Sequence, residues 1–433
     1  MKNKMRMLFL VFGLLVIFPM MLHPEVYRMR IDGPIETITE EYVVDSFNKI
    51  KDLSKSNAKL VIIEIDTPGG FSSSMRTIIK EMLGSPVPVC VFVSPRGSQS
   101  ASAGFFIMMA ADIACMAPGT NTGAAHPVSI TGGDFDKTMK EKVTNDSVAY
   151  IKSLAKNRNR NLDLAEKAVS ESKSYPAEEC LKDNLIEYMA QDIEDLLAQL
   201  EGKTITMVNG KSVTLALKSE RIKNLDMSAR QKFLKTITNP TLALILVLFA
   251  LAGLYIEFTH PGLIIPGVVG GICLLLAFLA FQVLPINYVG LGLILLSVGF
   301  FIAEIKVQGF GILGIGGIIS FILGSMMLIN APIPEMRPSM TTIIAFAIMF
   351  AFVFLFLTYK VLEAMKRRTP TGQEGLVGEK GMAKSIINKA EGKVFVHGEW
   401  WNAVSYGEEE IPEGTAVTIV SVDGFLLKVK QAS

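Results

Sequence analysis

The sequence contains little cysteine and has no excess of charge of one sign. Its cysteines form no Cys-x-x-Cys pair, so neither a zinc site nor a disulfide framework is supported, and we expect no metal or other cofactor. The 42 Lys and Arg residues balance 41 Asp and Glu residues, with no basic half or stripe. This balance argues against nucleic-acid binding as the main task. The four cysteines are Cys90, Cys115, Cys180 and Cys273.

Long apolar runs are what the sequence has in excess. Half of the 433 residues are hydrophobic and the mean hydropathy is +0.40, too apolar for one soluble globule. Residues 241–359 carry only five charges, whereas about 25% of all other residues are charged, which is typical of soluble domains. The composition therefore predicts a membrane-embedded block joined to soluble parts.

The N-terminus has the order of an export signal. Lys2, Lys4 and Arg6 precede the apolar run 7–22. Because no small-x-small cleavage site follows, we favour an uncleaved signal anchor at 1–22 over a removed signal peptide. In either case the residues that follow are expected outside the cytoplasm.

The membrane block, assigned to 240–360, divides into five predicted spans. An odd number of spans after an exported domain places the C-terminus in the cytoplasm, and the basic run 366–368 agrees with the positive-inside rule. A four-span alternative would put both soluble parts outside. The expected spans are 242–255, 263–283, 289–303, 310–329 and 340–359.

An internal repeat lies within this block. A glutamate followed by a fixed spacing of glycines occurs twice, about 47 residues apart. We interpret it as a duplicated helical hairpin whose glycines allow close helix packing. The repeated positions are Glu257, Gly262, Gly267, Gly270 and Gly271, matched by Glu304, Gly309, Gly314, Gly316 and Gly317.

Residues 25–230 alternate between short β-branched runs and amphipathic segments, which is typical of an α/β domain with its own core. A hairpin turning at Asn209-Gly210 is expected within 204–217. The predicted strands are 26–31, 59–65, 87–93 and 113–116, and the predicted helices are 38–54, 100–111 and 137–156.

The segment 369–433 contains short, glycine-punctuated runs at 381–383, 393–397, 416–422 and 425–429, which predict a small five-stranded barrel of the OB type. Trp400 and Trp401, the only tryptophans, lie here. An OB barrel can stack nucleobases on aromatic rings, but no basic groove is evident, so we favour core and interface packing for both.

Two segments of the α/β domain could carry chemistry. Gly69-Gly70 follows a strand and could turn backbone N–H groups towards a ligand oxygen, or could form a plain tight turn. Ser102 lies in Gly97–Gly104, which joins a strand to a small-residue helix and could present a hydroxyl there. Small residues at such a junction also serve close helix packing, and no Gly-x-Ser-x-Gly motif is present.

A serine nucleophile needs a base, and the residues offer two kinds. His126 offers an imidazole, the side-chain type that most often serves as a base near neutral pH, although a lone loop histidine is usually structural. Lys137, Lys140 and Lys142 begin a predicted helix, where most lysines are solvated and inert because only burial turns a lysine into a base. The residues alone do not choose between them.

The order of motifs resembles the full-length, protease-bearing NfeD family, membrane relatives of the Clp protease and signal-peptide peptidase A group. The resemblance covers nearly the whole chain and rests on the motifs together. They are DTPGG at 66–70, SASAG at 100–104, MAPGTNTGAAHP at 116–127, KVTN at 142–145, GLVG at 375–378 and GEWW at 398–401.

This resemblance implies a Clp- or crotonase-like α/β spiral, a transmembrane helical bundle and an OB barrel. It implies a Ser-Lys dyad of Ser102 and Lys142, with Ala103 and Gly69 or Gly70 forming the oxyanion hole. Apolar substrate segments would lie along strand edges near Gly70 and Met116.

His126 stays the alternative base, because Clp proteases place the histidine of their triad about two dozen residues after the serine. We favour Lys142 as the base and a structural or substrate-pocket role for His126.

The resemblance also implies a membrane-bound endopeptidase, with its active site outside the cytoplasm, that cleaves apolar stretches of stomatin- or flotillin-like membrane proteins. It further implies a homo-oligomer in contact with membrane lipid. A non-catalytic scaffold for a stomatin-like partner is one rival reading. An acyl-CoA enzyme of the crotonase type, which shares the spiral and the oxyanion hole, is another.

Overall fold

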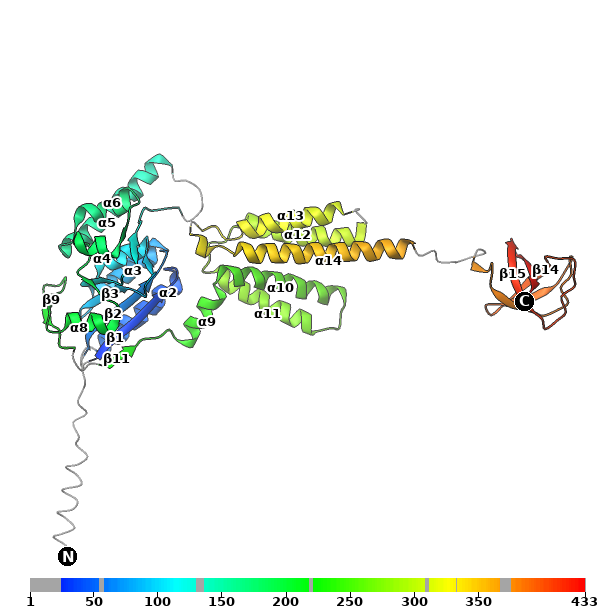
Figure 1. Cartoon of the computed structure of the whole chain (residues 1–433), viewed down its shortest axis with the longest axis horizontal. Coiled ribbons are helices and arrows are strands. Elements are labelled where there is room, and N and C mark those ends of the chain that lie inside the picture. The colour runs from blue at the N-terminus through cyan, green and yellow to red at the C-terminus, as the bar shows by residue number, and fades with distance from the viewer. Residues whose placement is uncertain are drawn as a thin grey trace, which may run out of the picture. The chain divides into compact units, whose positions relative to one another are not determined.

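The computed structural model describes residues 25–53, 58–129, 136–217, 221–307, 311–331, 333–366 and 375–432. The signal segment expected at 1–22 lies outside these residues. The chain divides into two compact units, residues 1–350 and 351–433. The first unit contains an α/β domain and apolar helices, and the second ends in a small β-barrel (Figure 1).

A six-stranded parallel sheet forms the centre of the α/β domain, in the order β11-β1-β2-β3-β5-β8. Its middle strands are buried runs rich in Val and Ile, because helices cover both faces of a parallel sheet. The strands expected from the sequence are confirmed, and the one expected at 87–93 begins two residues later. The strands are β1 (Glu25–Asp32), β2 (Ala58–Asp66), β3 (Val89–Val93), β5 (Ile113–Met116), β8 (Tyr188–Met189) and β11 (Arg221–Asn224).

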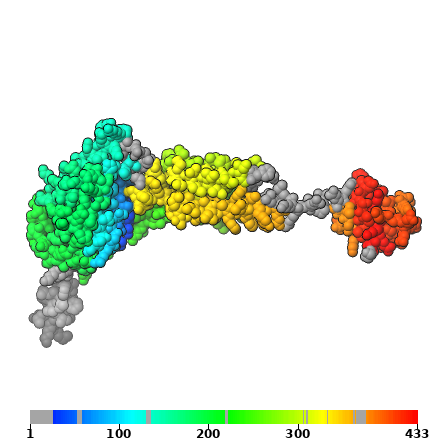
Figure 2. Space-filling view, turned by 45° about the horizontal axis from the view of Figure 1, so that its top comes forward, coloured from blue at the N-terminus to red at the C-terminus, as the bar shows by residue number. Residues whose placement is uncertain are grey.

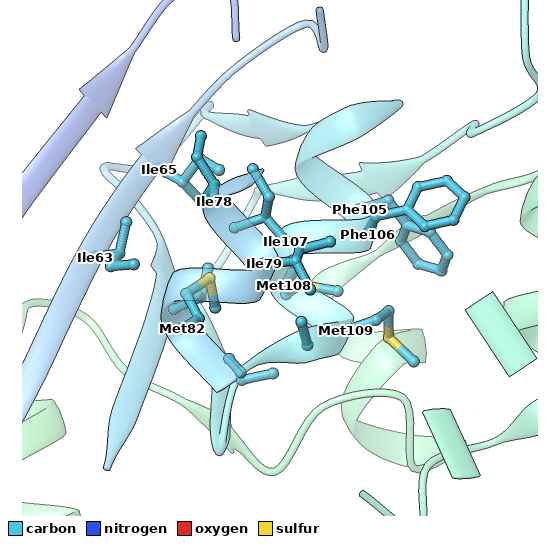
Figure 3. Packing of buried hydrophobic residues seen from close by; sticks show 14 of the residues in the cluster. Ile63, Ile65, Ile78, Ile79, Met82, Phe105, Phe106, Ile107, Met108 and Met109 are labelled. Atoms are coloured by element: carbon cyan, nitrogen blue, oxygen red, sulfur yellow. The ribbon is translucent and has the colours of Figure 1, made fainter. Parts of the chain in front are cut away.

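Apolar cores fill both sides of this sheet. Figure 3 shows the larger core, where Ile63 and Ile65 of β2 lie beside side chains of two helices, among them Ile78 and Ile107. The helices of that side are α2 (Thr37–Leu53), α3 (Ser72–Leu83), α4 (Ala103–Ala110), α5 (Lys137–Asn157) and α6 (Leu162–Ser170). The other side holds α8 (Ile193–Leu200) and the expected hairpin of β9 (Thr204–Thr206) and β10 (Ser212–Thr214).

A second, three-stranded sheet corrects one prediction. The helix expected from Ser100 begins only at Ala103, because Ser100 pairs with Thr122 in the neighbouring strand. A run of small residues carries no strong helix preference, so pairing with the neighbouring strand determines the conformation of its first residues. The sheet contains β4 (Gln99–Ser100), β6 (Asn121–Gly123) and β7 (Ser174–Pro176), and α7 (Ala177–Lys182) follows it.

Five apolar helices follow the short helix α9 (Ala229–Ile237). Residues of α10, of α12 and of the first half of α14 share one buried cluster, and the helices lie side by side (Figures 1 and 2). By length and composition, α10 and the segment Met340–Lys360 can each cross a membrane, and the other three provide shorter apolar segments, Ile265–Phe281, Tyr288–Glu304 and Ile312–Met327. The five are α10 (Pro240–Thr259), α11 (Ile265–Phe281), α12 (Tyr288–Val307), α13 (Ile312–Met327) and α14 (Met340–Lys366).

The repeated glutamates and the repeated glycines that the structure describes occupy matching places in two helical hairpins, and Gly309 lies outside the described residues. Glu304 accepts hydrogen bonds from the N–H groups of Gly311 at 2.8 Å and Gly314 at 3.2 Å, at the start of α13. Glu257 lies at the start of α11, where a Cβ at Gly267 would meet its side chain at 2.7 Å. Anions are favoured at helix N-termini, so Glu304 fastens its hairpin, whereas the buried Oε2 of Glu257 has no hydrogen-bond partner among the described residues.

The C-terminal barrel is closed, with strand order β12-β13-β14-β16-β15. It confirms the expected five-stranded OB-type barrel, but β14, which contains both tryptophans, was not among the expected runs. Of the expected core and interface packing, Trp401 shows core packing, whereas Trp400 is 63% exposed and only the interface role remains an expectation for it. The strands are β12 (Lys380–Ala383), β13 (Lys393–Val396), β14 (Glu399–Ser405), β15 (Ala416–Asp423) and β16 (Leu426–Gln431).

Candidate active site

Ser102 stands immediately before α4 in an unusual backbone conformation. Its φ is 51° and its ψ is −114°, and its side chain does not cap the helix. Its N–H donates to the carbonyl oxygen of Ala124 at 2.8 Å, which fixes this geometry. A positive φ in a residue other than glycine costs on the order of 1–3 kcal/mol, and such strain is concentrated at functional positions. Ser102 therefore occupies a strained turn like that of a nucleophile elbow, although its sequence motif is absent.

Gly69 provides space beside this serine. A Cβ at Gly69, whose φ is +112°, would lie 2.5 Å from the Cβ and 3.0 Å from the Oγ of Ser102. The Gly69 N–H donates to Thr67 Oγ1 at 3.1 Å, and its carbonyl accepts from the Ile35 N–H at 2.8 Å. Both backbone polar groups of Gly69 are thus occupied in holding the loop.

Two neighbouring N–H groups are unoccupied. Within the described residues, the backbone N–H groups of Gly70 and Ala103 donate to no acceptor. Both residues line the same cleft as Ser102. A Cβ at Gly70 would lie 2.0 Å from the carbonyl oxygen of Ile35, so only glycine fits there. Two free N–H donors beside a serine are the elements of an oxyanion hole.

Arg160 holds the far end of α4. Its buried guanidinium donates to the carbonyl oxygens of Met108 at 3.1 Å, Met109 at 3.0 Å and Ala111 at 3.1 Å. It also pairs with Glu187 at 2.7 Å. The last carbonyls of a helix need partners, and a cation there complements the helix dipole. We did not predict this residue, because a single arginine in a polar run gives no sign of burial.

Ser102 opens into a cleft of about 570 Å³. Arg76 and Asp146 form an ion pair in its wall, and Arg76 lies 4.4 Å from the ring of Tyr150. Burial raises the pKa of Tyr150, and the nearby Arg76 partly offsets this. The charges of the described wall are thus paired, and the surface that remains suits an apolar ligand. The wall also includes Phe71, Met75, Phe106, Ala125, Pro127 and Val128.

A connector between two apolar helices adds to this wall. Ile333 and Met336, which lie between α13 and α14, line the cleft together with Ser102. Phe71, next to Gly70, packs against the buried cluster that contains Met336. Sequence reasoning missed both connector residues, because more than 200 positions separate them from the serine.

The structure does not bring Lys142 to Ser102. Lys142 lies exposed on α5, is absent from the cleft lining, and shares no hydrogen bond with Ser102 in the described part of the chain. Its neighbour Val143 does line the cleft, as do Asp146 and Ser147 one turn later. The helix that carries Lys142 is therefore at the site, whereas Lys142 itself does not line the cleft.

His126 is not in the cleft lining either, although Ala125 and Pro127 on both sides of it are. Its Nδ1 lies 2.9 Å from the carbonyl oxygen of Val169, to which it donates. This bond ties the loop to α6, as expected of a structural histidine.

The expected substrate edge near Met116 is wrong. Met116 is fully buried and paired on both sides, with Val93 of β3 and Met189 of β8. A strand with two neighbours has no free hydrogen-bonding edge.

Glu36 lies buried beside Ile35, which holds the glycine loop, and it gives the domain a pH-dependent stability. Burial raises its pKa from 4.5 to about 7, and Lys235 partly opposes this shift. The folded state thus binds the proton more tightly than the unfolded state. The contribution of Glu36 to the free energy of unfolding should be complete below pH 4.5 and should fall by about 3 kcal/mol as pH rises from 4.5 to about 7.

We expect Glu36→Gln to remove this slope and to raise the thermal midpoint at pH 8. The measurement is thermal unfolding of the full chain in detergent between pH 5 and pH 8. Equal slopes in Glu36→Gln and the unmodified chain would contradict the assignment.

Comparison with known families gives three matches that together span most of the chain. The model of the NfeD1b N-terminal domain matches residues 25–209, that of the NfeD integral membrane domain matches 241–360, and that of the NfeD-like C-terminal, partner-binding domain matches 373–431.

Individual relatives agree. A membrane-bound protease of Pyrococcus horikoshii is 35% identical over 418 residues, which are 93% of this chain and 92% of the relative. Membrane protein NfeD1b of Bacillus subtilis is 27% identical over 304 residues, 66% of this chain and 64% of the relative.

Solved structures also match. One is the N-terminal domain of a membrane-bound stomatin-specific protease, solved as a lysine-to-alanine variant in complex with a substrate peptide. Its sequence is 35% identical, and it aligns with a TM-score of 0.45 over 50% of this chain and 98% of that chain. The same type of domain from P. horikoshii, specific for a stomatin homolog, is 35% identical with a TM-score of 0.42, over the same shares.

The three family models, the alignment with the archaeal protease over 93% of this chain and the sequence motifs all indicate the same family. The chain belongs to the NfeD family and is a membrane-bound serine protease.

Proposed function

We propose that this protein is an endopeptidase with a Ser-Lys dyad that cleaves apolar segments of stomatin- or flotillin-like membrane proteins. The observation that carries the proposal is the strained Ser102 with the free N–H groups of Gly70 and Ala103 beside it, all at one cleft. The stomatin specificity of the archaeal relative supports the substrate class.

In the proposed reaction, neutral Lys142 accepts the proton of Ser102 while Oγ attacks the scissile carbonyl carbon. The resulting oxyanion accepts hydrogen bonds from the N–H groups of Gly70 and Ala103. Lys142 then gives the proton to the leaving amine, the C–N bond breaks, and an acyl-enzyme remains. Lys142 then takes a proton from a water molecule as its oxygen attacks the acyl carbon, and returns this proton to Ser102 Oγ as the C–Oγ bond breaks and the acid leaves. Gly69 contributes space rather than a donor in this scheme, because its N–H is already bonded.

The dyad requires the first turns of α5 to turn the amine of Lys142 towards Ser102. Catalytic hydrogen bonds are often absent without substrate and form when it binds, so the exposed position of the amine is compatible with this role. Val143, the next residue after Lys142, lines the cleft, so the chain at this point of α5 is already part of the site. A substrate segment lying between residues 70–72 and 125–129 would contact apolar side chains on both sides.

We further propose five membrane crossings by α10 to α14 and an anchor at 1–22. The α/β domain, 25–230, then lies outside the cytoplasm, and the barrel, 369–433, lies inside it. Two of the five helices are long enough to cross unaided, and shorter apolar helices can span by local thinning of the bilayer. Contact with lipid and assembly into a homo-oligomer belong to the same proposal.

The choice of base is tested by three variants of the full chain, assayed for cleavage of an apolar fluorogenic peptide. Lys142→Ala should lower kcat/KM by at least about 10³-fold, as expected when the base of a nucleophile is removed. Lys142→Arg should be equally inactive, because a guanidinium keeps the charge but cannot accept a proton. His126→Ala should change kcat/KM by no more than a few fold, since the His126 ring bonds the backbone carbonyl oxygen of Val169.

A different order of effects would reject the dyad. Loss in His126→Ala with activity in Lys142→Ala would establish a histidine base. Rescue by Lys142→Arg would show that Lys142 provides only positive charge.

A further inference from the structure

Three apolar side chains form a continuous row on the outside of the C-terminal barrel. Met382 of β12 lies opposite Phe395 of β13, which lies opposite Trp400 of β14. They are 46%, 36% and 63% exposed, in that order. The rings of Phe395 and Trp400 meet edge to face, with centroids 6.1 Å apart. The row thus crosses three adjacent strands and faces solvent.

Folding of the barrel does not require this row. The alternating positions of the same strands point inward, and Ala383, Val394, Val396 and Ala403 form the core there with exposures of 2% or less. Side chains of a strand alternate between faces, so the exposed row is a second apolar surface. Contiguous exposed apolar side chains of this kind mark interaction sites.

Lysines flank the row. Lys380 and Lys384 stand two positions from Met382, and Lys393 stands two positions before Phe395, so strand alternation places all three on the same face. Lys384 Nζ lies 5.9 Å from the centroid of the Phe395 ring. None of the three forms an ion pair among the residues the structure describes. The basic surface around the apolar row is therefore unneutralised.

The charge of the rest of the barrel has the opposite sign. Residues 375–432 contain eight carboxylates and six lysines, and four of the carboxylates lie in the connection between β14 and β15, at Glu408, Glu409, Glu410 and Glu413. A basic face on an otherwise acidic barrel favours ligands of negative charge at that face.

We propose that this surface, named here the tryptophan face (Met382, Phe395 and Trp400 with Lys380, Lys384 and Lys393), docks an acidic peptide segment of a partner protein through an aromatic or aliphatic anchor. The apolar row accepts the anchor, and the lysines pair with carboxylates on both sides of it. Its width of one side chain per strand matches a single segment rather than a bilayer surface. The proposal goes beyond the proposed function and does not depend on the peptidase chemistry.

The chain provides its own reporter for the test. Its only tryptophans, Trp400 and Trp401, both lie on β14, so tryptophan fluorescence of the full chain reports the barrel alone. In a Trp401→Phe background Trp400 is the single emitter. This chain, in nanodiscs of zwitterionic lipid, is titrated with tryptophan-free peptides in three forms: acidic with Phe and Leu anchors, basic with the same anchors, and acidic with Ser in place of the anchors.

The acidic anchored peptide should shift Trp400 emission to the blue and protect it from iodide, with a Kd that rises with salt. The other two peptides should bind at least tenfold more weakly. Phe395→Ser, Met382→Ser and Lys384→Glu should each weaken binding about tenfold. The matched control is Phe425→Ser, which removes an 85% exposed ring from the turn between β15 and β16 and should bind as the background does.

Equal binding of the basic peptide, or an equal loss in Phe425→Ser, would overturn the proposal. So would an emission shift with anionic vesicles but with none of the peptides, because the face would then bind membrane. Cleavage of a soluble apolar peptide is measured on the same samples. If the chain cleaves this peptide but does not dock the acidic peptide, this inference fails and the proposed peptidase function stands. If it docks the acidic peptide but does not cleave, the proposed peptidase function fails and this inference stands.

Discussion

Ser102→Ala should lower kcat/KM for peptide cleavage by at least about 10⁴-fold, while leaving the fold intact. Removal of the nucleophile ends covalent catalysis, and the residual rate comes only from substrate binding and the N–H groups of Gly70 and Ala103. The hydroxyl of Ser102 does not cap α4, so its loss costs the folded state little. The measurement is kcat/KM of the full chain on an apolar fluorogenic peptide, with thermal unfolding in parallel.

The neighbouring serine gives a matched control. Ser100 is fully buried, and its Oγ has no hydrogen-bond partner within the described residues. Removing an unpartnered buried hydroxyl is nearly neutral or stabilising, so Ser100→Ala should keep kcat/KM within a few fold. If Ser102→Ala still cleaved, or if Ser100→Ala lost as much activity, Ser102 would not be the nucleophile.

Gly69→Ala should reduce kcat by about 10²-fold, because misplacing a reacting group by about 1 Å has an effect of this size. The added methyl group would lie 2.5 Å from the Cβ of Ser102, so one of the two loops must move. The defect should appear in kcat more than in KM, because the walls of the cleft are unchanged.

Gly97 separates this steric effect from backbone strain. It also has a positive φ, +87°, but a Cβ there would meet nothing within 4 Å. Gly97→Ala should therefore lose only about 1–2 kcal/mol of stability and keep near-normal activity. Similar losses of activity in both variants would show that strain, and not contact with Ser102, is the cause.

Much of the α/β domain could be predicted from the sequence because burial leaves a strong local pattern. The strands β1, β2 and β5 and the helices α2 and α5 were located to within one or two residues. A parallel strand covered on both faces must be apolar throughout, and a helix on its surface must show a periodic apolar stripe.

Other elements leave no such pattern. The strands β4, β6 and β7 have two or three residues each, too few to show alternation. The expected substrate edge at Met116 failed because β8, which covers that edge, is itself only two residues long. The exposed Trp400 breaks the alternation of β14, which is why that strand was missed.

The candidate site was predictable only at positions that a local sequence pattern marks. Gly69, Gly70 and Ser102 follow directly from strand ends, and the structure places them together. The sequence does not distinguish the bonded N–H of Gly69 from the free one of Gly70. That difference depends on the rotamer of the Thr67 hydroxyl, two residues before Gly69, and on Ile35, which bonds Gly69 and Phe71 from a distant position in the sequence.

The clamp by Arg160 has a consequence for the rate of the reaction. Helix α4 is buried along its whole length and held at its C-terminal end by three hydrogen bonds, while its first residue presents an N–H beside Ser102. The donor is therefore oriented when the chain folds, and little reorganisation energy remains for each turnover. Part of the rate enhancement of such a protease therefore comes from the rigidity of a helix whose anchoring residue, Arg160, lies at the opposite end from the scissile bond.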